Sequence, residues 1–96
     1  MGKSYAHPLL VLKTLPNRLE IVRVGISASQ SVGSAVDRNR AKRRIRSCLD
    51  EVIPRIPPGW DLVFLARQAV VEVPFPELRK AVGALLVQAG LQGKST

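Results

Sequence analysis

Apolar side chains recur with two different periods along the chain, and the shorter period defines one stretch clearly. Apolar side chains alternate within Glu20–Ser29, so one face of an extended backbone carries Val22, Val24, Ile26 and Ala28. The opposite face is small and polar, with a single cation, Arg23. This alternation predicts a strand that buries one face and leaves the other open to water or to a ligand.

Two further apolar runs predict strands of a different kind. Leu9–Leu15 is expected to form a mostly buried strand, which the turn residues Pro16 and Asn17 end. Trp60–Arg67 is almost continuously apolar, which is typical of a strand covered on both faces. An additional short strand is expected at Gln30–Val32.

The longer period, close to 3.6 residues, predicts two amphipathic helices. The first begins after the cap residue Ser34, which forms an S-x-x-D capping pattern with Asp37, and it ends before Pro54. Its core-facing stripe consists of Ala41, Ile45, Cys48, Leu49 and Val52. The second helix begins near Pro76 and ends at Gly90. Its stripe consists of Leu78, Val82, Leu85, Leu86 and Ala89.

The order of these elements, β-β-(β)-α-β-α, predicts the α+β class, with a small sheet of three to four strands and two helices. The 96 residues suffice for one small core, so we expect a single domain over residues 1–91 and a flexible tail at residues 92–96. The expected core consists of Val11, Val22, Val24, Ile26, Ile45, Leu49, Leu62, Phe64, Val82 and Leu85.

Positive charge is concentrated in the first predicted helix. The chain has 15 Lys and Arg against 7 Asp and Glu, a net charge of +8, and six of the nine residues from Arg38 to Arg46 are cationic. A solvated helix face normally mixes charge signs, whereas cations without an intervening acid repel one another unless a polyanion is bound. Helical spacing puts Arg40 and Arg44 on the far side of the helix. We expect the helix to bind nucleic-acid phosphates through Arg38, Asn39, Arg40, Lys42, Arg43, Arg44 and Arg46.

Other candidate chemistry is scarce. One cysteine and one histidine exclude a zinc site of the usual Cys/His kind, and the carboxylates lack the spacing of metal ligands. We therefore expect no catalytic side chain, no metal bound by the protein alone and no small-molecule substrate. No apolar stretch approaches the length of a membrane span, and the single Cys48 fits a reducing, cytoplasmic setting.

The segment from Gly33 to Arg46, G-S-A-V-D-R-N-R-A-K-R-R-I-R, resembles the signature of the bacterial ribonuclease P protein subunit. The family's motif is G-N-A-V-x-R-N-R-x-K-R-x-x-R. An R-V-G-I-S segment precedes it here at the family's distance, and an apolar strand ending in A-R comes after it. The resemblance extends from Gly2 to about Leu91. The residues that match the motif are Gly33, Ala35, Val36, Arg38, Asn39, Arg40, Lys42, Arg43 and Arg46.

The resemblance implies an accessory subunit of a ribonucleoprotein endoribonuclease. In that family the RNA subunit binds Mg²⁺ and cleaves the 5′ leader from precursor tRNA, while the protein binds the RNA subunit and the leader. It also implies a left-handed β-α-β crossover and a leader cleft, for which Lys13, Arg23 and Ser27 are candidates. The family's N-terminal helix is expected to be missing, because Gly2-Lys3-Ser4 corresponds to the family's segment just after that helix.

Other classes of protein fit the same basic helix. A general or ribosomal RNA-binding protein without a role in tRNA processing is the main alternative, and the ordered motif is what argues against it. A DNA-binding protein would be expected to have a helix-turn-helix or a dimerising heptad, and the sequence has neither. A membrane-surface helix would need a broader apolar face with exposed aromatic side chains.

Overall fold

The computed structural model describes residues 2–92, and its centre is a four-stranded mixed sheet. The strands are β1 (Lys3–Ala6), β2 (Leu10–Pro16), β3 (Val22–Ala28) and β4 (Trp60–Ala66), in the spatial order β1-β2-β4-β3. β3 and β4 are parallel, and the other two pairs are antiparallel. The helices are α1 (Ala35–Val52) and α2 (Phe75–Gln88), with short 3₁₀ turns η1 (Gln30–Val32), η2 (Ile53–Arg55) and η3 (Gln68–Val71). The α+β class predicted from the sequence is confirmed.

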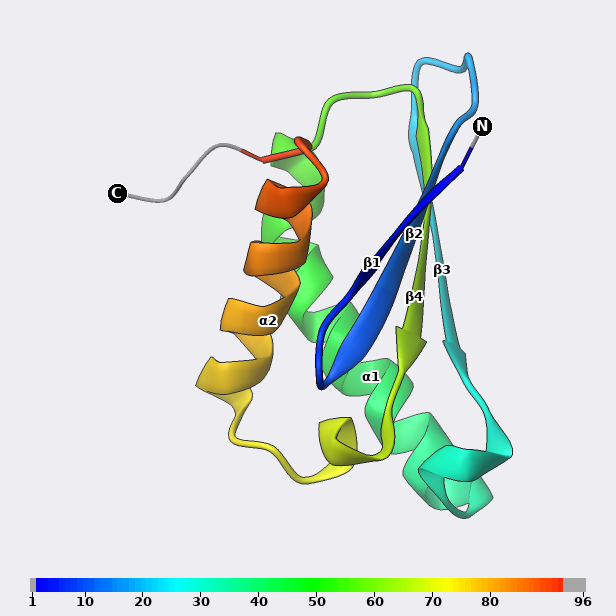
Figure 1. Cartoon of the computed structure of the whole chain (residues 1–96), viewed down its shortest axis with the longest axis vertical. Coiled ribbons are helices and arrows are strands. Elements are labelled where there is room, and N and C mark those ends of the chain that lie inside the picture. Colours follow the sequence, from blue (N-terminus) through cyan, green and yellow to red (C-terminus); the bar gives the residue numbers. More distant parts are fainter. Residues whose placement is uncertain (1, 93–96) are drawn as a thin grey trace.

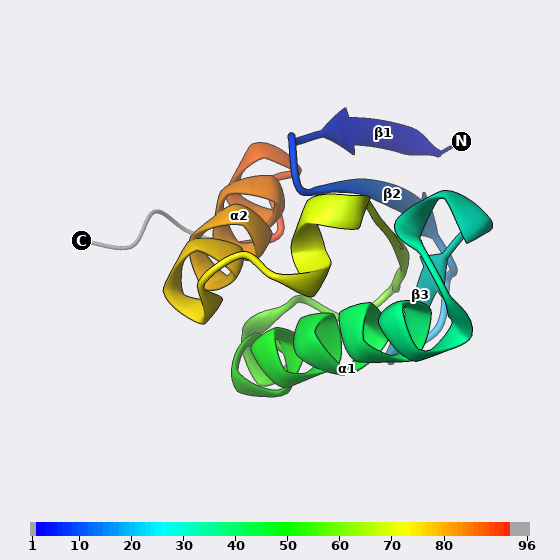
Figure 2. The same ribbon diagram turned by 90° about the horizontal axis from the view of Figure 1, so that it is seen from below.

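Both helices pack on the same face of the sheet (Figure 1). α1 lies against β3 and β4, and α2 lies against β1 and β2. The end-on view shows both helices on one side of the strands (Figure 2). The two views together show that the crossover from β3 through α1 to β4 is left-handed, as the resemblance implies.

The core lies between this face and the helices, where the inward side chains of β2 and β4 meet the apolar stripes of α1 and α2. Leu12, Phe64 and Ile45 are completely buried there. The prediction for Val11 is wrong, because β2 alternates and turns Leu10 and Leu12 inward while Val11 faces outward with its partner Leu65. The uninterrupted apolar run conceals this alternation in the sequence.

Two predictions about the strands are also wrong. Gln30–Val32 forms the 3₁₀ turn η1, in which the Val32 amide donates to the Ser29 carbonyl at 3.0 Å. The additional strand is Lys3–Ala6, a short edge strand without a two-residue pattern, which backbone pairing to β2 holds in place. β4 was expected to be covered on both faces, but Val63 on its outer face is 37% exposed.

The start of α1 agrees closely with the capping prediction. The Asp37 amide donates to the Ser34 hydroxyl at 3.2 Å, and the Asp37 carboxylate accepts from the Ser34 amide at 3.3 Å. Gly33 precedes this cap with φ +140°, and a Cβ there would lie 2.5 Å from an Asp37 carboxylate oxygen. Only glycine fits this position without displacing the cap. Of the tail predicted at residues 92–96, residues 93–96 lie outside the described part of the chain.

Candidate nucleic-acid interface

One side of α1 forms a row of polar and cationic side chains, which we call the outward row. It consists of Arg38, Asn39, Lys42, Arg43 and Arg46, and all of them except the half-buried Arg38 are exposed. Spacings of three and four residues place these side chains next to one another on the helix surface. The ion pairs formed among residues 2–92 join Arg23 to Asp61 and Arg79 to Glu51, so none of them neutralises the outward row.

Arg40 and Arg44, which we call the carbonyl-bound pair, have different surroundings. The Arg40 Nε donates to the Val71 carbonyl at 2.9 Å. Arg44 donates through one terminal nitrogen to the carbonyls of Val70 and Val71, at 2.9 and 2.8 Å, and through the other to the Val73 carbonyl. These carbonyls lie at or just beyond the C-terminal end of η3, where carbonyls lack partners within the helix.

The expectation that Arg40 and Arg44 lie on the far side of the helix is therefore wrong. Arg44 comes three residues after Ala41, which puts it on the flank of the buried stripe. On that flank the chain returns after β4 and presents its η3 carbonyls to α1. Five of the seven predicted phosphate-binding residues thus share the outward row, and the other two hold α1 against η3.

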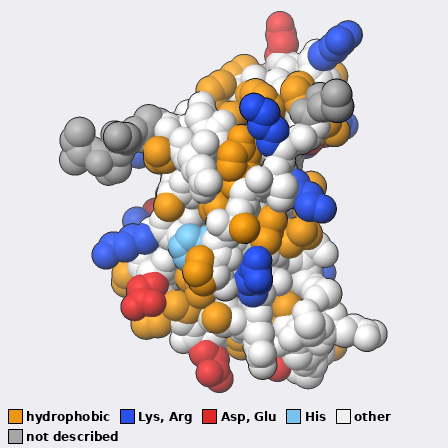
Figure 3. All heavy atoms as spheres, viewed as in Figure 1, with side chains coloured by type: hydrophobic (Ala, Val, Ile, Leu, Met, Phe, Trp, Pro, Cys, Tyr) orange, Lys and Arg blue, Asp and Glu red, His pale blue; other side chains and the backbone are white. Residues whose placement is uncertain are grey.

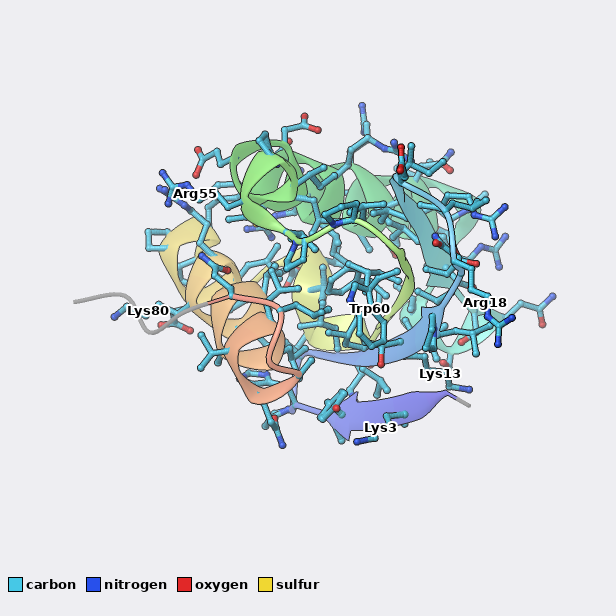
Figure 4. All side chains as sticks on the ribbon, turned by 90° about the horizontal axis from the view of Figure 1, so that it is seen from above. Lys3, Lys13, Arg18, Arg55, Trp60 and Lys80 are labelled. Atoms are coloured by element: carbon cyan, nitrogen blue, oxygen red, sulfur yellow. The ribbon has the colours of Figure 1, made fainter. Side chains whose placement is uncertain are left out.

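One face of the sheet lies away from both helices, and we call it the bare face (Figure 1). The alternation of β2 and β3 places the candidate cleft residues on it. Across the strands, Lys13 is opposite Val63, Arg23 is opposite Asp61, and Ser27 is opposite Leu65. Opposed residues point to the same face, so the register brings Lys13, Arg23 and Ser27 together. Figure 4 shows Lys13 on this side of the sheet and Arg55 and Lys80 on the helix side.

Arg23 and Asp61 form a bidentate ion pair across β3 and β4. The Arg23 Nε donates to Oδ1 of Asp61, and an Arg23 terminal nitrogen donates to Oδ2, both at 2.7 Å. The Asn17 amide also donates to Oδ1, at 2.8 Å. The hydrogen bonds from Arg23 and Asn17 hold the pKa of Asp61 below its usual value. Asp61 and Asn17 are not among the residues predicted for this site, because only the strand register reveals that they meet Arg23.

An open hollow of about 460 Å³ lies on the bare face beside this pair. Its walls come from the N-terminal strand, from β2 and from β4, and include Ser4, Lys13, Leu15, Asp61 and Val63. Leu15 is 47% exposed, so the hollow has an apolar wall next to the Lys13 amine. Apolar side chains beside a cation suit a nucleic-acid strand, which presents flat bases and charged phosphates in turn.

Another open hollow, of about 680 Å³, is lined by residues of α1 and α2 and by cations that include Arg55, Arg79 and Lys80. The face in Figure 3, over β1 and α2, has scattered basic side chains with acidic ones among them. No group of three or more His, Cys, Asp or Glu within residues 2–92 is placed to hold a metal ion. Cys48 is buried in the core, and this burial raises the pKa of its thiol. Neither described helix combines the length and the hydropathy that crossing a bilayer requires.

Comparison with known proteins gives one consistent result. The family model described as Ribonuclease P matches residues 1–90. The ribonuclease P protein component of Herpetosiphon aurantiacus is 42% identical over 90 residues, covering 94% of this chain and 73% of the relative. The protein component of Dehalococcoides mccartyi is 44% identical over 94 residues, covering 98% of this chain and 77% of the relative.

Solved structures agree with the sequence relatives. The Staphylococcus aureus RNase P protein has a TM-score of 0.83 with 30% identity, covering 94% of this chain and 83% of that one. The Thermotoga maritima RNase P protein has a TM-score of 0.81 with 28% identity, covering 91% of this chain and 83% of that one.

Proposed function

The chain belongs to the ribonuclease P protein family, and on this premise we propose that it binds a ribonuclease P RNA through α1 and the 5′ leader of precursor tRNA through the bare face. The observation that carries the proposal is the exposed cationic row on α1, whose cations form no ion pair with the acidic side chains of residues 2–92.

The outward row suits the backbone of a folded RNA. Arg43 and Arg46 present planar forks that bind phosphate oxygens bidentately, and Lys42 adds a point charge beside them. The Asn39 amide supplies both a donor and an acceptor, which suits the sugar or base edge next to a phosphate. Arg40 uses only its Nε in its bond to Val71, so its terminal fork remains able to join the phosphate contacts.

The bare face suits a single strand in extended form. The small residues Gly25 and Ser27 let an RNA backbone approach closely, and Lys13 supplies a charge in the same row as Gly25. The strand would lie on a different surface from the outward row, because α1 packs on the opposite face of the sheet. One molecule of the chain thus has separate surfaces for the RNA subunit and for the substrate.

The chemistry of cleavage is assigned to the RNA subunit in this proposal. The described residues contain neither a metal-binding cluster nor a nucleophile paired with a base. The RNA would bind the Mg²⁺ ions, and the protein's cations would share the screening of phosphate charge. The complex would work in the cytoplasm, where precursor tRNA is made.

Reconstitution tests this function directly. The chain is combined with a bacterial ribonuclease P RNA and precursor tRNA, and cleavage is monitored as the Mg²⁺ concentration is lowered. We expect cleavage at the mature 5′ end to persist at Mg²⁺ concentrations at which the RNA alone is inactive. The purified chain alone should leave the precursor intact. A general RNA-binding protein would bind the RNAs without lowering the Mg²⁺ requirement for correct cleavage, and that outcome would contradict the proposal.

Salt dependence tests the role of the outward row. Four to six phosphate contacts predict a slope of log K against log [salt] of about −3 to −5. Arg43→Ala should make the slope shallower by about 0.7 to 0.9, because one phosphate contact is lost. Arg55→Ala is the matched control, since Arg55 is an exposed arginine on η2 outside the row. Equal effects of the two substitutions would show that overall charge, rather than the row, governs binding.

A further inference from the structure

The ion pair on the bare face fixes the orientation of one guanidinium group. Arg23 contacts Asp61 side-on, through Nε and one terminal nitrogen. Asn17 holds the same carboxylate from the loop between β2 and β3, and its own side-chain oxygen accepts from the Leu19 amide at 2.7 Å. The guanidinium plane is therefore set by three segments of the chain: β3, β4 and the loop.

The pairing leaves a defined set of donors free. A guanidinium carries five N–H groups, and the side-on contact uses two of them. The remaining three include the two terminal donors that form the end-on fork, and the Arg23 side chain is 57% exposed. Because Asp61 neutralises the charge, this fork has little attraction for a phosphate and is better suited to a pair of neutral acceptors.

The surroundings of the fork suit a flat, weakly polar group. Leu15 shares the row of Asp61 and Arg23 and is 47% exposed, and Val63 in the next row is 37% exposed. Gly25 is the next residue after Arg23 on the same face, and a Cβ there would have Val63 Cγ2, at 3.9 Å, as its nearest neighbour. The floor beside the fork is therefore open and largely apolar. The Lys13 amine, in the row of Val63 and Gly25, is a nearby cation that forms no ion pair with the acidic side chains of residues 2–92.

We propose that Arg23, held by Asp61 and Asn17, recognises a guanine base of the leader by donating to its O6 and N7, while Lys13 binds a leader phosphate. This inference rests on the proposed function, because it names what the bare face recognises in its substrate. Guanine offers two adjacent acceptors to an arginine fork, whereas adenine pairs its N7 acceptor with an amino donor. A single strand leaves that edge accessible, and the apolar floor supports the ring.

The test uses the chain assembled with a ribonuclease P RNA and precursor tRNAs whose leaders consist of uridines with one guanosine at successive positions. We expect one position at which guanosine strengthens binding by about 5- to 150-fold over adenosine. Replacing that guanosine by 7-deazaguanosine, which lacks the N7 acceptor, should remove most of the gain. Arg23→Lys keeps the charge but loses the fork, so it should abolish the preference and leave the salt slope unchanged.

Two matched variants separate the roles of the face. Lys13→Ala should make the salt slope shallower by about 0.7 and keep the guanosine preference. Arg55→Lys makes the same chemical change as Arg23→Lys on the helix side. It should keep both the salt slope and the guanosine preference. If Arg23→Lys does not fold, the comparison of guanosine with 7-deazaguanosine still tests whether the N7 acceptor is recognised, because it leaves the protein unchanged. Leader-dependent binding without a guanosine preference would overturn this inference alone, whereas binding that ignores the leader would overturn the proposed function.

Discussion

The two flanks of α1 carry similar cations in different surroundings. On one flank Lys42, Arg43 and Arg46 extend into solvent, whereas on the other Arg40 and Arg44 donate to backbone carbonyls of the segment from Val70 to Val73. A motif rich in arginine therefore does not assign one role to its members. What decides the role is whether a set of unpaired carbonyls or open solvent faces the side chain. The carbonyl-bound pair is expected to control stability, and the outward row is expected to control RNA binding.

The largest effect on stability is expected for Arg44→Ala. This change leaves the carbonyls of Val70, Val71 and Val73 without the donors that Arg44 supplies. We expect the free energy of unfolding to fall by about 2 kcal/mol, because unsatisfied acceptors in a half-buried site lose hydrogen bonds that water only partly replaces. Denaturant unfolding measures the loss, and Lys42→Ala on the outward row is the control. Equal losses in the two variants would remove the distinction between the flanks.

Ser34→Ala separates a loss of stability from a loss of RNA contacts. It removes the hydroxyl that accepts from the Asp37 amide and touches neither group of cations. We expect a loss of about 1 kcal/mol in the free energy of unfolding, as is typical of N-cap substitutions. RNA affinity measured well below the unfolding temperature, and its salt slope, should not change. A shallower slope in this variant would mean that destabilising α1 is enough to weaken phosphate binding.

Arg40→Ala tests the residue that lies between the two behaviours. Its Nε bond to Val71 is a single hydrogen bond, so we expect a loss of up to about 1 kcal/mol of stability. Its terminal fork is available to a phosphate, so we also expect the salt slope to become shallower by up to about 0.9. Unfolding and salt titration of the same preparation measure both effects. A change in slope without any loss of stability would place Arg40 with the outward row.

The smallest effect is expected at acidic pH, on the bare face. The lowered pKa of Asp61 means that its pair with Arg23 contributes stability above the unfolded pKa of aspartate, about 3.9, and that this contribution is lost as the pH falls through the folded pKa. Arg23, whose pKa is raised, stays charged throughout this range. The stability difference between the native chain and Asp61→Asn should be constant from about pH 5 to 8 and shrink below about pH 4. A difference that persists undiminished at pH 3 would assign the effect to packing.

The sequence predicted those features that depend on local pattern. The cap at Ser34, the stripe that buries Ala41 and Ile45 and the end of α2 just before Gly90 all depend on spacing within one element, and all are confirmed. The alternation of β3 also predicted which of its side chains face away from the core.

The features that escaped prediction depend on contacts between distant segments. Arg44 meets the carbonyl of Val70, 26 residues away, and Arg23 meets Asp61, 38 residues away. The strand Lys3–Ala6 has no pattern of its own and forms because β2 offers it an edge. The outward row and the bare face were predicted as candidate sites, but which of their cations are already paired within the protein required the topology.

The position of β4 also constrains the order of events as the chain folds. β4 lies between β2 and β3, although it comes after both of them and after α1 in the sequence. Until β4 inserts, β2 and β3 have no partner at the edges they later share with it, and the link from Val22 to Trp60 must close a long loop. During synthesis the residues of the basic helix therefore leave the ribosome before the bare face can form. The residues proposed to bind the RNA subunit are thus synthesised before β4 completes the surface proposed for the substrate.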